Sequence, residues 1–199
     1  MYLPKHQNSS KVAMRDQIMD KSFIFICLLL LTIIPVTLQE VQKKPIKKHE
    51  PCKRIVLYYH DIIFRGNDPV NATSYAATNA SGIGSFDFGK VVVFDDPMTR
   101  DQHLTSPPVA RAQGMYFYNV KYAPNAWFAY SVVFNSSEYE GTLNIVGDDI
   151  ITEKTRDLSV VGGTGDFFMT RGIVTFETEN VEGTKYFRLK MDIKLYECY

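Results

Sequence analysis

Two acidic positions in this chain interrupt apolar stretches, where a carboxyl group could serve acid–base chemistry. Asp61 lies within IVLYYHDIIF (55–64), and Asp149 follows Asp148 soon after GTLNIV (141–146). A carboxyl group buried among apolar side chains is desolvated, which raises its pKa and keeps it available as a proton donor near neutral pH. An Asp also suits an exposed strand end or a turn, so spacing alone leaves both interpretations open.

A pair of tyrosines provides a candidate ligand contact. Tyr116 and Tyr118 share strand parity with Gly114, whereas Phe117 faces the other way. The two phenols either line a ligand cavity or fill the interior of a barrel, and the alternation does not choose between these interpretations.

Motifs for metal, nucleophilic and cofactor chemistry are missing from the sequence. The histidines stand alone, and there is no HExxH, paired CxxC or G-x-S-x-G pattern. The GGTG run at 162–165 lacks the spacing of a dinucleotide loop, and we interpret it as a turn that needs positive φ. The formal net charge is zero and Lys and Arg are scattered, which argues against nucleic-acid binding. The sequence therefore predicts no metal, no cofactor and no nucleic-acid partner.

Short runs rich in β-branched and aromatic residues must position these groups. Turn-forming residues separate the runs, which cover 54–63, 90–94, 110–120, 127–135, 141–146, 158–161, 172–178 and 186–197. In the last run, apolar residues alternate with polar ones from Phe187 to Leu195, as in a half-buried strand. Since no helical periodicity follows the N-terminal segment, we predict an all-β domain. An eight-stranded antiparallel β-barrel able to hold one small ligand is favoured, and a two-sheet sandwich is the rival.

The N-terminal segment is typical of a secretory signal. Basic residues precede an apolar run at 23–34, which Pro35 closes and which is too short to span a bilayer comfortably. We predict a signal peptide over 1–39 with an uncertain cleavage site, a flexible segment over 40–50 and one domain over 51–199. The mature protein is then expected to be extracellular and not held in a membrane.

The cysteines support export. Cys27 falls within the signal, which leaves Cys52 and Cys198 as the mature pair. In an oxidising compartment they would form a disulfide between the first and last residues of the domain, and two free thiols are the alternative.

Three sequons after the signal predict N-glycosylation at Asn71, Asn79 and Asn135. We expect Asn71 and Asn79 to lie on one exposed loop. Together with the signal and the cysteine pair, the sequons predict a secreted glycoprotein.

Seven ordered blocks of this sequence resemble the plant dirigent family, specifically its lignan-forming branch. They are LYYHDIIF, FGKVVVFDDPMT, SPPVARAQGMYFY, WFAYSVVFNSS, GTLNIVGDDI, TRDLSVVGGTGDFFMTRGI and YFRLKMDIKLYECY, and they cover nearly all of 51–199. The resemblance implies a barrel related to the allene oxide cyclase fold, assembled as a trimer or dimer. It also implies that the protein directs 8–8′ coupling of monolignol radicals, such as those of coniferyl alcohol, in the apoplast or cell wall. A separate laccase or peroxidase would generate the radicals, and the product would be one enantiomer of a pinoresinol-type lignan.

The same resemblance implies roles for six residues. They are Asp61 and Asp149 as acids that each protonate one quinone methide, Tyr116 and Tyr118 as phenol contacts, Arg156 as a positioning or polarising group, and Phe187 as an aromatic wall. Family members often have Gly-Ala-Asp where this chain has Gly-Asp-Asp at 147–149. Because adjacent strand residues face opposite ways, we expect the additional Asp148 to face outward.

Two further functions are compatible with these residues. One is a pterocarpan-synthase-like dehydratase, which would remove water from an isoflavanol through a quinone methide. The other is a binding or cell-wall assembly module without catalysis. An oxidant requirement separates coupling from dehydration, and Asp-to-Asn substitutions separate both from simple binding.

Overall fold

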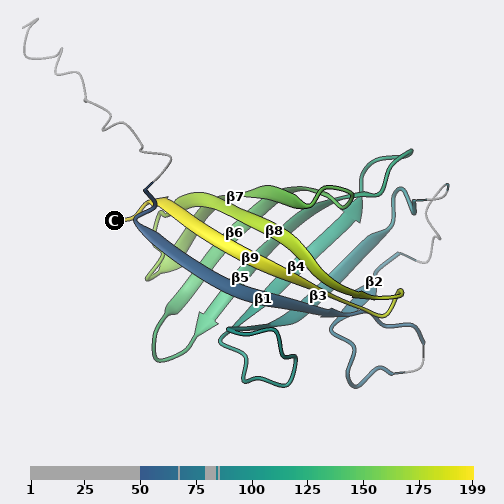
Figure 1. Cartoon of the computed structure of the whole chain (residues 1–199), viewed down its shortest axis with the longest axis horizontal. Coiled ribbons are helices and arrows are strands. Elements are labelled where there is room, and N and C mark those ends of the chain that lie inside the picture. The colour runs from purple at the N-terminus through teal and green to yellow at the C-terminus, as the bar shows by residue number, and fades with distance from the viewer. Residues whose placement is uncertain (1–49, 67, 79–83, 85) are drawn as a thin grey trace, which may run out of the picture. The chain divides into compact units, whose positions relative to one another are not determined.

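The barrel domain is described by a computed structural model over residues 50–66, 68–78, 84 and 86–199. The expected signal peptide, nearly all of the flexible segment and the sequon at Asn79 lie outside these residues. Nine strands make up the described chain (Figure 1): β1 Lys53–Ile62, β2 Ser74–Ala76, β3 Val91–Thr99, β4 Ala110–Tyr118, β5 Asn125–Asn135, β6 Glu140–Ile150, β7 Thr155–Gly165, β8 Arg171–Glu182 and β9 Tyr186–Glu197. No described segment forms a helix with the length and apolarity of a membrane span.

Eight of the strands close into an antiparallel barrel. Hydrogen-bonded neighbours follow the order β1-β9-β8-β7-β6-β5-β4-β3, and β3 returns to β1 through the pairs Tyr58–Thr99 and Tyr59–Met98. Figure 1 shows the tilted strands wrapped around one interior. Closure pairs both edges of what would otherwise be an open sheet. The predicted barrel is confirmed, and the two-sheet sandwich is wrong.

The short strand β2 was not predicted from the sequence. It pairs with β3 beyond the seam between β1 and β3, from Ser74–Phe94 to Ala76–Val92. Its three residues include one buried side chain, that of Ser74, so no alternation is long enough to detect. This strand matters because it brings a hydroxyl next to a buried acid of β1, as described below.

The fifth predicted run, 141–146, is shorter than the strand that it predicts. The sequence interpretation ended the strand before Asp148 and Asp149, which were expected at a strand end, but β6 continues to Ile150. The reason is that β5 pairs with β6 along its whole length, from Asn135–Glu140 to Asn125–Ile150. Paired backbone groups therefore override the turn preference of the two acids.

The turn predicted at 162–165 is also wrong. These residues are the end of β7, and the chain turns at 166–169. A Cβ at Gly163 would lie 2.4 Å from the Phe167 carbonyl oxygen, so this glycine permits a close backbone approach. Within the run, positive φ is found at Gly165 alone.

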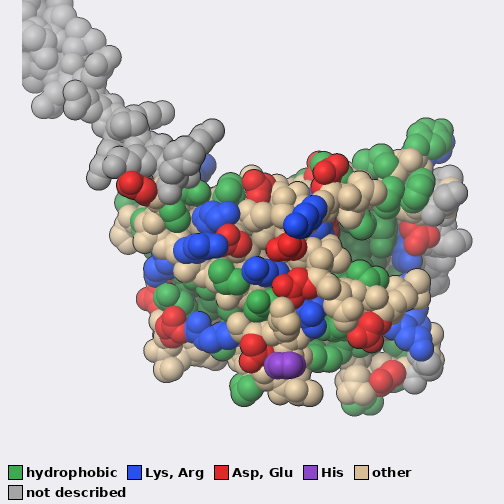
Figure 2. Space-filling model, in the orientation of Figure 1, with side chains coloured by type: hydrophobic (Ala, Val, Ile, Leu, Met, Phe, Trp, Pro, Cys, Tyr) green, Lys and Arg blue, Asp and Glu red, His purple; other side chains and the backbone are tan. Residues whose placement is uncertain are grey.

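The interior changes character along the barrel axis. Near the start of β1 and the end of β9 the core is apolar, with aliphatic Ile55, Leu57 and Ile193 and aromatic Phe134 and Phe167 all buried. Toward the opposite end, polar side chains enter the same interior among further aromatic ones: Tyr59, Asp61, Phe94, Asp96, Tyr116, Phe128, Tyr130, Asp149 and Arg156. On the outer surface, acidic and basic side chains are interspersed (Figure 2). The polar end of the interior is therefore where the fold departs from an ordinary hydrophobic core.

A disulfide joins Cys52 and Cys198, whose Cα atoms are 6.3 Å apart. Cys52 directly precedes β1 and Cys198 directly follows β9, and these two strands pair along their full length. The predicted bridge is confirmed.

His60 of β1 is fully buried although it points away from the barrel interior. Thr99 Oγ1 donates a hydrogen bond to the Asp101 carbonyl oxygen at 2.5 Å, so the 2.8 Å contact with His60 Nε2 requires that Nε2 donates. His60 Nδ1 then accepts from the Tyr186 hydroxyl at 2.8 Å. Burial, together with the nearby Arg188 charge, lowers the pKa of His60 from 6.5 to about 4.

This lowered pKa predicts acid sensitivity. The unfolded chain binds a proton at His60 below pH 6.5 and the folded chain only below about pH 4, so stability falls as the pH drops through that window. We expect the advantage of the wild type over His60→Gln in unfolding free energy to shrink by about 3 kcal/mol between those pH values. Urea titrations of both proteins measure this difference, and a pH-independent difference would contradict the assignment.

Candidate active site

A cavity of about 230 Å³ opens at the polar end of the barrel. The ends of β1, β4, β6 and β8 and the starts of β5, β7 and β9 all meet there, at the right of Figure 1. Its walls consist of Ile63, Arg65, Tyr116, Tyr118, Ala126, Phe128, Asp149, Ile151, Arg156, Thr178, Val181, Gly183, Thr184, Phe187 and Leu189. Five of the six residues singled out from the sequence therefore line one cavity, and Asp61 is the exception.

Asp149 enters the cavity from β6 as half of a buried ion pair. Arg156 Nε, on β7, donates to Asp149 Oδ1 at 2.5 Å, and Arg156 Nη1 donates to Thr178 Oγ1 at 2.9 Å. Burial raises the pKa of the Asp149 carboxyl, whereas the hydrogen bond and charge of Arg156 oppose this rise. Asp148, one residue earlier, is exposed and accepts a hydrogen bond from Asn119 at 2.7 Å. The two adjacent acids therefore face opposite sides of the barrel wall, as strand geometry requires.

Tyr116 and Tyr118 bring their phenols into the cavity from β4. Tyr116 stacks on Phe128 with ring centroids 4.8 Å apart and meets Tyr118 edge-on at 5.9 Å. Burial raises the pKa of both phenols, and the nearby Asp61 carboxyl raises them further. Both hydroxyls consequently stay protonated at neutral pH and are available as hydrogen-bond donors.

Asp61 lies behind the cavity lining and is fully buried. It pairs across the ladder with Phe187, and its Oδ1 accepts a hydrogen bond from the Ser74 hydroxyl of β2. Burial raises the pKa of Asp61 from 3.8 to about 7, although the Ser74 hydrogen bond and the Arg65 charge act in the opposite direction. The inward alternative for Asp61 is thus the one that the fold adopts, and its carboxyl titrates near neutral pH.

Sequence reasoning missed two polar groups of this interior. Asp96 of β3 is fully buried, and Tyr59 of β1 is 2% exposed. The signal for Asp96 was present, because Val92, Phe94 and Met98 share its strand parity and all are buried. The predicted run ended at residue 94, however, because Asp-Asp-Pro at 95–97 is a composition typical of turns.

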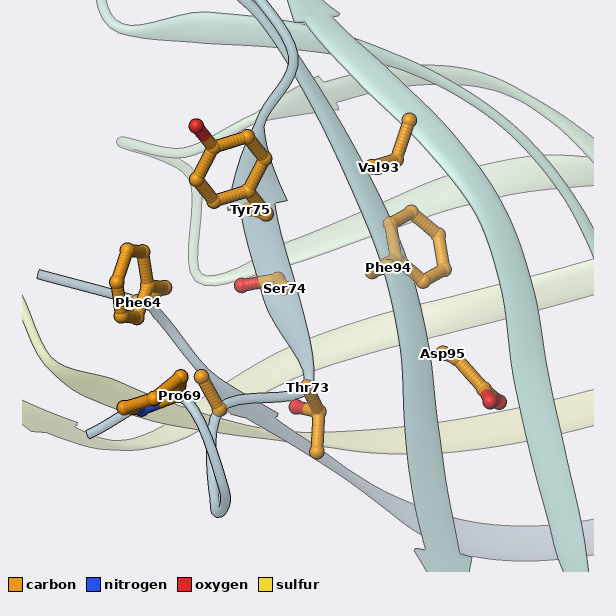
Figure 3. Close-up of a pocket in the computed structure, with 9 residues that line it drawn as sticks. Phe64, Pro69, Thr73, Ser74, Tyr75, Val93, Phe94 and Asp95 are labelled. Carbon is orange, nitrogen blue, oxygen red and sulfur yellow. The ribbon is translucent and has the colours of Figure 1, made fainter. Parts of the chain in front are cut away.

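A larger recess of about 480 Å³ lies between residues 69–75, with Phe64, and β3 (Figure 3). Its lining includes Phe64, Pro69, Tyr75 and Val93, and its single acid is Asp95. Asp95 is exposed, and Arg111 Nε donates to its Oδ1 at 2.6 Å. This recess shares no lining residue with the barrel cavity, and it lacks the desolvated acid that acid–base chemistry needs.

Metal binding has no candidate among the residues that the structure describes. Within them, His, Cys, Asp and Glu side chains form no group of three or more that could hold an ion.

Of the predicted glycosylation sites, Asn71 and Asn135 are exposed.

Fold and cavity together define the class of this protein. It is a closed antiparallel β-barrel with a ligand-sized cavity at one end, lined by phenols and by a buried acid. The model of the Dirigent-like protein family matches residues 52–196. This chain therefore belongs to the dirigent family.

Relatives of known sequence and structure agree with this assignment. The chain is 60% identical to Dirigent protein 5 of Arabidopsis thaliana, over 90% of this chain and 97% of that protein. It is 46% identical to a dirigent protein of Sinopodophyllum hexandrum, over 90% and 98% of the two chains. Among solved structures, the pterocarpan synthase dirigent protein GePTS1 is similar with a TM-score of 0.67 and 26% identity, over 74% of this chain and 90% of that chain.

Proposed function

We propose that this protein directs the 8–8′ coupling of coniferyl alcohol radicals to one enantiomer of a pinoresinol-type lignan. The observation that carries the proposal is a cavity walled by phenols and aromatic rings, with the buried acid Asp149 in its lining and a second buried acid, Asp61, whose pKa is raised to about 7, close to its phenols. Family membership supports it, as do the seven blocks that resemble the lignan-forming branch.

The coupling step needs orientation rather than a redox centre. A separate laccase or peroxidase removes one electron and one proton from each coniferyl alcohol, and two radicals then form the C8–C8′ bond with almost no intrinsic barrier. A protein can control such a step by holding the reactants in one geometry. The 230 Å³ cavity is smaller than the roughly 300–1,000 Å³ of drug-sized ligand sites. It therefore suits one phenylpropanoid unit, which the second radical meets at the open mouth.

The acids serve the step after coupling. A proton passes from a carboxyl group to the quinone methide carbonyl oxygen, the side-chain hydroxyl forms the new C–O bond, and the hydroxyl proton returns to the carboxylate. We assign Asp61 as one donor, with the Tyr116 and Tyr118 hydroxyls relaying its proton to the cavity. Asp149 is the second acid, and Arg156 orients it and the substrate oxygen. Phe187 forms an aromatic wall.

Extracellular action follows from the same proposal. The signal-like N-terminus, the disulfide and the exposed sequons at Asn71 and Asn135 support a glycosylated protein of the apoplast or cell wall. The proposal includes assembly of the protein into a homo-oligomer, either a trimer or a dimer.

Dehydration is the second candidate function, because the similar structure GePTS1 is described as a pterocarpan synthase. An acid in a dry cavity can protonate a leaving hydroxyl, and a quinone methide is again the intermediate. That reaction consumes no oxidant, whereas radical coupling cannot begin without one.

An oxidant-dependence assay therefore tests the proposal. We expect coniferyl alcohol with a limiting one-electron oxidant and the secreted protein to give an excess of one pinoresinol enantiomer, and no product when the oxidant is omitted. Chiral chromatography measures both outcomes. A racemic product equal to the protein-free control would reject directed coupling, and oxidant-free turnover of an isoflavanol would favour the dehydratase.

A further inference from the structure

Two buried acids lie close to each other at the seam where β1 and β3 separate. The β1–β3 ladder contains the pairs Tyr58–Thr99 and Tyr59–Met98 and ends there. Asp61 follows on β1 and Asp96 precedes on β3, each two residues beyond the last pair, and the two carboxyls interact electrostatically. The strands diverge at this point because β2 enters beside β3, with Asp95 N donating to the Thr73 carbonyl oxygen at 2.8 Å. Thr73 Oγ1 also accepts from Ile62 N at 3.0 Å.

Several buried oxygens at this seam lack a hydrogen-bond partner. Buried oxygens without one include Asp61 Oδ2, both Asp96 carboxyl oxygens and the Tyr59 hydroxyl. Both acids are 0% exposed, and neither forms a salt bridge in the described part of the chain. Two carboxylates without a cation partner in a dry interior are strongly unfavourable, so at least one of them carries a proton.

The surrounding groups indicate which acid keeps its proton. Asp96 faces Asp61 and the Tyr59 hydroxyl within the barrel, and the outward Asp95 precedes it on β3. The Ser74 hydrogen bond and the positive charge of Arg65 favour the ionised form of Asp61, which also interacts electrostatically with the cavity phenols of Tyr116 and Tyr118. Burial and the Asp61 charge raise the pKa of Asp96 well above its ordinary value, although the Thr73 and Tyr59 hydroxyls act in the opposite direction.

We propose that Asp96 is a positioning residue that stays protonated in the folded protein and donates a hydrogen bond to Asp61 Oδ2, directly or through one water molecule. The Tyr59 hydroxyl donates in turn to Asp96. Ser74 already holds Asp61 Oδ1, so both oxygens of the carboxylate that remains after proton transfer are stabilised. The consequence for coupling rests on the proposed function, whereas the protonation of Asp96 does not.

Proton release on unfolding tests the assignment without any substrate. A carboxyl that is protonated when folded and ionised when unfolded releases one proton at pH 7. We expect Asp96→Asn to release about one proton fewer than the wild type in urea, and the exposed control Asp95→Asn to match the wild type. Equal release from Asp96→Asn and the wild type would overturn the proposal.

Infrared spectroscopy of the wild type tests the same assignment if the Asp96→Asn variant does not fold. In the wild type at about pH 8, above the titration of Asp61, a carbonyl band from a protonated carboxyl should persist. Its absence would equally overturn the proposal.

The pH profile of directed coupling tests the functional consequence. Asn is a neutral donor, so Asp96→Asn should leave the alkaline fall in enantiomeric excess within about 0.3 pH units of the wild type. Asp96→Val removes the donor and should move that fall upward by about one unit, as should Ser74→Ala. A downward move in Asp96→Asn would mean that Asp96 was ionised and would reject the proposal. If coupling itself is racemic but proton release falls, the acid pair stands and the proposed function fails.

Discussion

Replacing Asp61 with Asn is expected to abolish directed coupling while making the folded protein more stable. General acid catalysis typically contributes about 100-fold or more, so cyclisation on the protein should slow by at least that factor. The uncyclised intermediate would then occupy the cavity for longer, so most radicals would couple undirected in solution and the enantiomeric excess of the lignan should fall to near zero. Chiral chromatography of the product, at limiting oxidant, measures this loss.

The gain in stability follows from the sign of the pKa shift. The folded-state pKa of Asp61, about 7, lies above its ordinary value of 3.8, so the wild type loses stability as the pH rises between these values. Asn remains neutral throughout. We therefore expect Asp61→Asn to exceed the wild type in unfolding free energy by on the order of 3 kcal/mol at pH 7, with the excess vanishing near pH 4.

Asp157→Asn is the matched control for this experiment. Asp157 is exposed on β7 and accepts a hydrogen bond from Thr175 Oγ1 at 2.6 Å. It should retain both the enantiomeric excess and the pH dependence of the wild type. Full enantiomeric excess in Asp61→Asn would show that the acid plays no part and would favour a binding module that directs radicals by shape alone.

Removing the disulfide is expected to cause the largest loss of stability. The bridge between Cys52 and Cys198 spans 146 residues. The chain-entropy model gives about 5 kcal/mol for a loop of this length, since the reduced unfolded chain gains the freedom that the bridge denies it. The double variant Cys52→Ser, Cys198→Ser should therefore melt roughly 10–20 °C lower in calorimetry.

Chemical reduction provides the control for the double variant. Wild-type protein treated with a thiol reductant should reach the same lowered melting temperature, and the reductant should leave the double variant unchanged. Because the bridge lies at the end of the barrel opposite the cavity, the folded double variant should still direct coupling at low temperature. A melting temperature within about 2 °C of the wild type would mean that the β1–β9 ladder alone fixes the chain ends.

Local pattern was sufficient to predict most of the fold. Alternation such as that from Phe187 to Leu195 is a property of the strand itself, so the sequence predicts which face is buried. Cysteine count determined the disulfide partners once Cys27 was assigned to the signal. Paired ladders determined the extents of the strands, however, which is why the end of β6 and the end of β7 were misjudged.

For the candidate site, too, the sequence indicated the residue types but not their contacts. Asp61, Tyr116 and Asp149 could be named from sequence because a carboxyl or phenol within an apolar run is unusual. The alternation of side chains along β1 could not show that Asp61 lies behind the cavity lining. That position depends on its ladder partner Phe187 of β9 and on its hydrogen-bond partner Ser74 of β2. The ion pair of Arg156 with Asp149 likewise depends on contact across the barrel wall.

Sequence by itself therefore determined a disulfide-bridged all-β domain and the types of residue able to do acid chemistry. Only the tertiary structure decided that Asp149 is held by Arg156, that the pKa of Asp61 is raised to about 7, and that Asp96 lies close to Asp61 at the seam. The physical reason is that a pKa depends on desolvation and on charges from other strands. Neither exists until the barrel closes.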